Sequence, residues 1–268
     1  MHKPEINKDF PNFWHALLLL FLLFALEGII AILFYTLGYR YQGGEPSSYA
    51  IVLLAIGIVT SLLLKYKNIG YQQLFHFSRS SVQSTVAVFA LPLLLICYGE
   101  YYLLSDIDAY LMSWRPMSTD ELDMLTRMID TGLASFVIVC LVAPVVEEML
   151  FRGLILRGFM NNYSPVKSIL LSSLLFAAFH LNVYQFVTAF IVGCLLGWIY
   201  IKARSLWPCI IHHALINSTA FMSWTTYDEK SAPLAQPEFN SPVENILAFL
   251  AIALGVVMVL KISSPKKA

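Results

Sequence analysis

The run APVVEEMLFRGLILRGF, residues 143–159, places charged side chains inside an otherwise apolar segment. A carboxylate in hydrocarbon costs roughly 3 kcal/mol or more, so an embedded charge needs a partner or a function. Glu148 and Arg152 are spaced i, i+4, which lets them pair on one helix face. Glu147 points about 100° away from Glu148 and cannot easily share that pair. The spacing therefore indicates Glu147 as the functional carboxylate, supported by Glu148 and Arg152.

Two other apolar segments carry polar residues at helical spacing. His180 ends the stretch FAAFH (176–180), and HALIN (213–217) places His213 and Asn217 on one face. His212 points about 100° from His213, toward another helix or toward lipid. At a rise of about 1.5 Å per residue, His180, His213, Asn217 and Glu147 fall at overlapping depths of their helices. Scattered structural polar residues would have no reason to share a depth, so we expect one common site.

These groups are suited to activating a water molecule, for example for hydrolysis of a peptide bond. A glutamate shielded from water can act as a general base near neutral pH, and a hydrogen-bonded imidazole can hold the same water. The Asn217 amide, with His213, can donate to the tetrahedral oxyanion, which contributes roughly 3 kcal/mol in other enzymes.

The elements that must position these residues are membrane-spanning helices. Hydrophobic residues make up 58% of the 268 and charged residues only 13%, against about 25% in ordinary soluble domains. A bilayer core of about 30 Å needs about 20 apolar residues in a helix. We expect an all-α polytopic membrane protein, a single transmembrane domain over 1–268, with the cavity among the fourth, fifth and seventh of eight helices. The eight predicted ranges are 13–37, 49–64, 83–104, 132–157, 166–181, 184–202, 206–224 and 243–262.

The distribution of basic residues predicts the orientation of these helices. With the N-terminus in the cytoplasm, thirteen of the 17 Lys and Arg residues fall on the inside and four on the outside, as the positive-inside rule requires. Both termini are therefore expected in the cytoplasm. The connection near 181–184 is short enough to predict an antiparallel hairpin. The first apolar run is too long for the core of a cleavable signal peptide.

Other polar features have structural interpretations. Glu27 is expected to pack between helices, and Glu100, near the outer end of its span, is expected to reach water. The four cysteines lie in apolar runs and are expected to be buried thiols. Residues 118–130 predict an amphipathic helix on the outer interface, capped by Ser118 or Thr119. Residues 225–242 predict an exposed outer loop. The 17 basic residues are balanced by 17 acidic ones, so no basic face indicates nucleic acid.

Three motifs together resemble the CPBP family of intramembrane proteases. EEMLFR (147–152) is similar to its EExxxR motif, FAAFH (176–180) to FxxxH, and HALIN (213–217) to HxxxN. The family includes type II CAAX prenyl endopeptidases and bacterial proteins described as bacteriocin-immunity or abortive-infection proteins. The resemblance implies that Glu147 and His180 activate a water, that His213 and Asn217 face them, and that the motif core covers about 132–224.

The resemblance leaves the catalytic type and the competing functions open. Two histidines and a glutamate form a known zinc set, which here would be Glu147, His180 and His213, but the sequence has no HExxH and the same residues suit a metal-free mechanism. No cofactor other than zinc is indicated. A non-catalytic immunity or peptide-binding protein could use the same cavity. A proton-coupled transporter usually shows an internal duplication, which we do not find.

The substrate class is expected to be a peptide or protein in or near the lipid bilayer. The short chain favours a bacterial inner-membrane protein, and a prenylated substrate is not expected there. The sequence does not favour any one of peptide pheromones, bacteriocins or membrane-anchored regulators.

Overall fold

The computed structural model describes residues 10–39, 46–130, 132–225 and 239–263. Within these ranges the regular elements are helices, together with one isolated backbone bridge between His76 and Ser205. Long helices occur at all eight predicted positions: α1 (Phe13–Thr36), α2 (Pro46–Lys67), α4 (Val82–Trp114), the continuous run α6 to α8 (Leu133–Phe159), α9 (Pro165–Phe179), α10 (Val183–Ala203), α11 (Leu206–Thr225) and α12 (Pro242–Ser263). The short helices are α3 (Tyr71–Phe75) and α5 (Thr119–Asp130).

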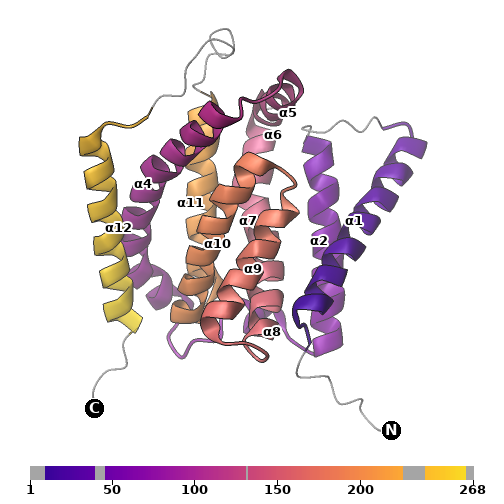
Figure 1. Ribbon diagram of the computed structural model, residues 1–268. Coiled ribbons are helices and arrows are strands. Elements are labelled where there is room, and N and C mark those ends of the chain that lie inside the picture. The colour runs from indigo at the N-terminus through magenta and orange to yellow at the C-terminus, as the bar shows by residue number, and fades with distance from the viewer. Residues whose placement is uncertain (1–9, 40–45, 131, 226–238, 264–268) are drawn as a thin grey trace.

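Six of the long helices are long and apolar enough to cross a membrane, which confirms an all-α, multi-pass membrane protein. The other two are α9, which has only 15 residues, and α11, which carries the polar HALIN stretch. A count of eight crossings therefore stays a prediction. The start of α1 and the end of α12 lie at the same end of the bundle, as an even number of crossings requires (Figure 1).

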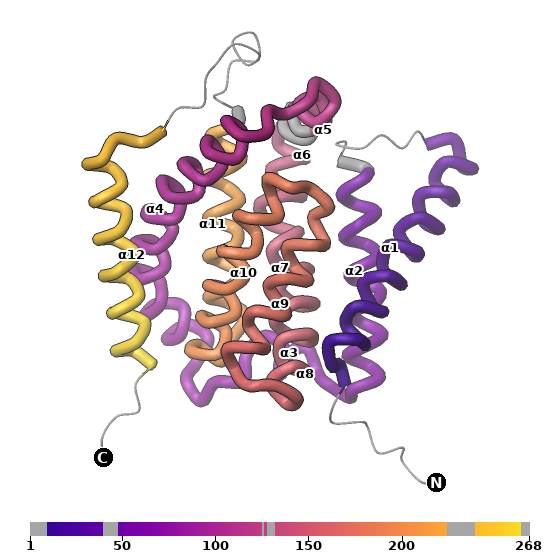
Figure 2. The backbone as a smooth tube through the Cα atoms, viewed as in Figure 1, coloured from indigo at the N-terminus to yellow at the C-terminus, as the bar shows by residue number. Residues whose placement is uncertain are grey.

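The helices stand side by side, with the α6–α8 run in the middle of the bundle (Figures 1 and 2). It is flanked by α9, α10 and α11 on one side and by α2 on the other, while α1 and α12 lie at the two edges. Exposed large apolar side chains are concentrated on the edge helices, for example Phe21 and Ile32 on α1 and Leu250 on α12. Such side chains fit a lipid environment, so the polar residues of the central helices are the ones shielded from lipid.

Close helix contacts depend on glycines at two places. A Cβ added to Gly99 in α4 would lie 2.4 Å from the Ala248 carbonyl oxygen of α12. A Cβ on Gly255 in α12 would lie 2.7 Å from the Pro92 carbonyl oxygen of α4. The two backbones can approach only because neither position has a side chain, as is common between membrane helices.

The central run is not a regular α-helix, which the apolar pattern did not predict. It contains two π-helical segments, Val137–Val142 and Met149–Leu156, on either side of α7 (Ala143–Glu148). Pro144 has no N–H, and its ring would clash with the carbonyl one turn earlier in a regular helix. Wider π turns relieve such conflicts and often occur at functional sites. The EEMLFR motif begins in α7 and ends in the second π segment.

The helical hairpin of α9 and α10 confirms the predicted tight connection. Leu181 adopts a left-handed conformation (φ 51°), and Asn182 caps α10 by accepting from the Tyr184 N–H at 2.9 Å. The Tyr184 hydroxyl donates to the Arg115 carbonyl at 2.6 Å, and Arg115 pairs with Glu121 at 3.0 Å. These contacts fasten the link between α4 and α5 to the hairpin.

Helix α5 confirms the amphipathic helix predicted at 118–130. Ser118 is its N-cap, because its hydroxyl accepts from the Glu121 N–H at 3.3 Å while Glu121 accepts from the Ser118 N–H at 2.9 Å. The Ser118 backbone N–H, followed by the Arg115 guanidinium, lowers the pKa of Glu121. The side chains of Leu125 and Ile129, and most of the predicted loop 225–242, lie outside the described residues.

Candidate active site

Glu148 and Arg152 form the predicted pair, and both are fully shielded from solvent. Arg152 Nη1 donates to Glu148 Oε1 at 2.7 Å, with side-chain exposures of 1% and 0%. Arg152 Nη2 donates to the Gly193 carbonyl at 3.3 Å, and its guanidinium lies 4.4 Å from the centre of the Phe176 ring. A single arginine thus joins the central helix to α9 and α10 while neutralising a buried carboxylate.

His213 of α11 lies between the two adjacent glutamates. Its Nδ1 is 2.9 Å from Glu148 Oε1, and its Nε2 is 3.8 Å from Glu147 Oε2. A carboxylate that already accepts from Arg152 can only accept again, so Nδ1 of His213 carries a proton. Its Nε2 faces Glu147 at a separation beyond direct hydrogen bonding. The two glutamates therefore have different environments, although they are neighbours in the chain.

Glu147 is the more accessible member of the pair. Its side chain is 13% exposed, and no hydrogen bond to it is found in the part of the chain that the structure describes. Glu148 is committed to Arg152 and His213, whereas Glu147 has only the distant His213 ring beside it within those same ranges. A carboxylate with free acceptor oxygens and limited water access can bind and deprotonate a water molecule.

His180 ends α9 with one nitrogen fixed and the other available. Its Nδ1 lies 2.9 Å from the Phe176 carbonyl, which can only accept, so Nδ1 is protonated. In neutral His180, Nε2 then carries the lone pair. The imidazole packs edge-on against the Phe176 ring at 4.9 Å, and His213 packs against the same ring at 5.7 Å. The two histidines therefore flank one phenyl ring, and no direct bond joins His180 to Glu147 among the described residues.

Asn217 lies one turn beyond His213 on α11, as the HALIN spacing predicts. Its Nδ2 donates to the Val139 carbonyl at 2.9 Å. Val139 belongs to the first π segment, so Asn217 joins α11 to the part of the central helix that precedes Glu147 in the chain. One N–H of the amide is used in this bond, and the other remains.

Two further polar residues, Glu100 and His212, form a buried pair behind His213. His212 Nε2 lies 2.6 Å from Glu100 Oε2, with side-chain exposures of 0% and 6%. The expectation that Glu100 reaches water is wrong, because α4 and α11 enclose it. Glu100 of α4 thus binds His212, and Glu148 of α7 binds His213, on different faces of α11. The sequence signalled each member of this pair separately, as a polar residue embedded in an apolar segment, but it could not show that they pair, since they lie 112 residues apart.

The residues do not converge as a metal site would. In the described ranges, no three His, Cys, Asp or Glu side chains are grouped so that they could hold a metal ion. His213 Nδ1 and His180 Nδ1 are occupied by Glu148 and the Phe176 carbonyl. These bonds leave Nε2 of each histidine available, as in many metal sites, so only the lack of convergence among the described residues argues against zinc at Glu147, His180 and His213.

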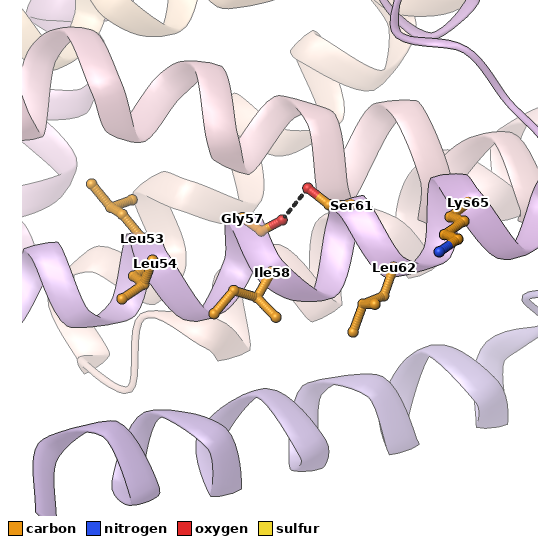
Figure 3. A pocket seen from close by; sticks show the side chains of 7 residues that line it. All are labelled: Leu53, Leu54, Gly57, Ile58, Ser61, Leu62 and Lys65. Carbon is orange, nitrogen blue, oxygen red and sulfur yellow. Dashed lines mark hydrogen bonds between the residues drawn. The ribbon is translucent and has the colours of Figure 1, made fainter. Parts of the chain in front are cut away.

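Two hollows on the surface lie away from the polar cluster. The larger is an apolar groove of about 510 Å³ along α2, which ends at Lys65 (Figure 3). The second is lined by aromatic residues of α3 and by Trp207. None of the residues of the Glu147 cluster lines either hollow.

The fold and this cluster define a multi-pass membrane protein with a group of carboxylate, imidazole and amide side chains among its central helices. Residues 129–219 match the family model described as Rce1-like, type II CAAX prenyl endopeptidase. The match covers about a third of the chain and includes all three motifs, which confirms the resemblance to the CPBP family. Over residues 129–219 the chain is similar to type II CAAX prenyl endopeptidases, and this similarity supports a CAAX-type intramembrane protease as its general class. Nothing among curated proteins or solved structures matches it.

Proposed function

We propose that the protein is an endopeptidase that hydrolyses a peptide bond with a water activated by Glu147 and His180. The observation that carries this proposal is the contrast between the two glutamates. Glu148 is buried and neutralised by Arg152, whereas Glu147 is partly exposed and has no hydrogen bond among the described residues. If these residues only stabilised the fold, we would expect Glu147 to be hydrogen-bonded as Glu148 is.

Hydrolysis would proceed with each proton assigned to a named group. One O–H of the water donates to Glu147 and the other to Nε2 of His180, which turns an oxygen lone pair toward the substrate carbonyl carbon. Glu147 takes the proton as the C–O bond forms. The free N–H of Asn217 donates to the oxyanion, and His213 donates to it through Nε2 when its imidazole carries a proton on both nitrogens, a proton that it keeps throughout the reaction. When the C–N bond breaks, Glu147 returns its proton to the leaving amine, giving one acid and one amine.

The same geometry favours a metal-free reaction over a zinc-dependent one. Because Glu147, His180 and His213 do not converge on one point among the described residues, we expect purified protein to keep its activity after treatment with a strong chelator. Metal analysis of the same sample would show no stoichiometric zinc. Loss of activity on chelation, restored by zinc alone, would establish the metalloprotease instead.

We place the protein in a bacterial inner membrane with both ends of the chain in the cytoplasm. Supporting this orientation, the helix ends nearest the start of α1 carry Lys65, Lys67, Arg157, Lys202 and Lys261. The substrate is then a peptide or protein that reaches the bilayer. A membrane immunity or peptide-binding protein is the alternative.

Comparison of membrane proteomes tests the proposed function directly. Cells with the parental protein and cells with Glu147→Ala would be compared for new peptide termini in the membrane fraction. We expect a set of termini that disappears in the variant while the variant protein is present at the parental level. Equal termini in both cells, with an immunity phenotype that survives Glu147→Ala, would support the binding protein.

A further inference from the structure

The first π segment leaves one backbone carbonyl without its usual donor. In π-helical geometry each N–H bonds to the carbonyl five residues earlier, and the Ala143 N–H indeed donates to the Ile138 carbonyl. In the same pattern, the N–H of residue 144 would donate to the Val139 carbonyl. Residue 144 is proline and has no N–H. The donor one residue earlier, Ala143, is already used.

The Asn217 side chain supplies the missing hydrogen bond, at 2.9 Å from Nδ2 to the Val139 carbonyl. A carbonyl can only accept, so this contact determines which end of the carboxamide faces Val139. The bond also fixes where the second N–H of Nδ2 and the Oδ1 atom point. Nearly all buried backbone carbonyls in proteins have a hydrogen-bond donor. The Val139 carbonyl lacks a backbone donor because residue 144 is proline, so its bond to the Asn217 amide is favoured.

We infer that Pro144 is a positioning residue, which orients the Asn217 amide by leaving the Val139 carbonyl for it. Pro144 lies in α7, three residues before Glu147, so the turn that carries the general base also sets the oxyanion donor. This inference rests on the proposed function for its effect on catalysis. The structural link from Pro144 to Asn217 does not.

A double-substitution cycle on stability tests the link without any substrate. Full-length variants Pro144→Ala, Asn217→Ala and their combination would be compared by thermal unfolding in detergent micelles. Alone, Asn217→Ala leaves the Val139 carbonyl unpaired, and we expect a loss in Tm of about 2–4 °C. In the Pro144→Ala background a backbone N–H becomes available at that position, so Asn217→Ala should cost little there. Equal losses in both backgrounds would overturn the link.

Kinetics then test the positioning role. The substrate would be a quenched fluorogenic peptide that spans the cleavage site most dependent on Glu147 in the membrane proteome. We expect Pro144→Ala to lower kcat by about ten- to a hundredfold at unchanged KM, although its Tm is equal to or above that of the parent. A structural proline would show the reverse, with lower Tm and parental kcat. In the Asn217→Ala background, Pro144→Ala should have no further effect on kcat.

Pro92 provides the matched control, because it is also a proline inside a helix, in α4. Pro92→Ala makes the same chemical change away from Asn217 and should leave kcat at the parental value. A peptide cleaved at the parental rate by Glu147→Gln protein would refute the proposed function but would leave the stability cycle valid. Parental kcat in Pro144→Ala, with an inactive Glu147→Gln, would refute the positioning role alone.

Discussion

Purified Glu147→Gln protein should be folded and almost inactive. The change keeps the size of the side chain and removes its capacity to take a proton, so we expect kcat to fall by about 10²–10⁴-fold. Since the Glu147 carboxylate makes no hydrogen bond within the described structure, the substitution leaves no other group unpaired. The melting temperature in detergent should therefore stay at the parental value.

Two comparisons make this result specific to Glu147. Glu27→Gln, the same change at a glutamate of α1, should cleave the peptide at the parental rate. Substrate binding, measured by the anisotropy of a labelled peptide, should persist in Glu147→Gln. If the Glu147→Gln protein cleaved the peptide at the parental rate, Glu147 would not be part of the mechanism. If the variant showed no cooperative thermal unfolding, its loss of activity would be due to misfolding.

Substitution of Arg152 by leucine should produce the largest loss of stability in the chain. Arg152→Leu leaves Glu148 buried at 0% exposure with only His213 beside it. Breaking a buried pair by removing one partner costs about 3–5 kcal/mol. The substitution also removes the bond to the Gly193 carbonyl and the contact with the Phe176 ring. We expect a large fall in the midpoint of thermal unfolding.

Two other arginine variants separate charge from geometry. Arg152→Lys keeps the charge but loses the planar fork that contacts Glu148 and Gly193 together, so it should recover only part of the stability. Arg157→Gln removes a half-buried arginine with one backbone contact, to the Gln73 carbonyl at 3.3 Å, and should cost about 1 kcal/mol. An Arg152→Leu protein as stable as Arg157→Gln would show that the buried pair contributes little.

The amino-acid pattern was sufficient to predict where the helices lie and which side chains pair within one helix. Apolar runs and loop residues predicted the position of every long helix, because burial in lipid demands a near-continuous apolar stretch. Spacing also predicted the Glu148–Arg152 pair and the common face of His213 and Asn217, since both follow from helix periodicity alone. These are local properties, so they can be obtained without knowing how the helices pack.

Contacts between segments far apart in the chain could not be predicted from the spacing of residues. The bond between Glu100 and His212, and the position of His213 between two glutamates, depend on how α4, α7 and α11 are rotated against one another. The π segments depend on the packing around Pro144 as well as on the proline itself. The catalytic roles of Glu147, His180, His213 and Asn217 remain proposals that the experiments above decide.

The short length of α9 has a consequence for the surrounding lipid. Its 15 residues span about 22 Å, against about 30 Å for the hydrocarbon of an ordinary bilayer. If α9 crosses the bilayer as predicted, we expect this hydrophobic mismatch to thin the bilayer around the helix, including the end where His180 is located. A scissile segment would then meet the aqueous phase in that thinned region without crossing the full thickness of the membrane.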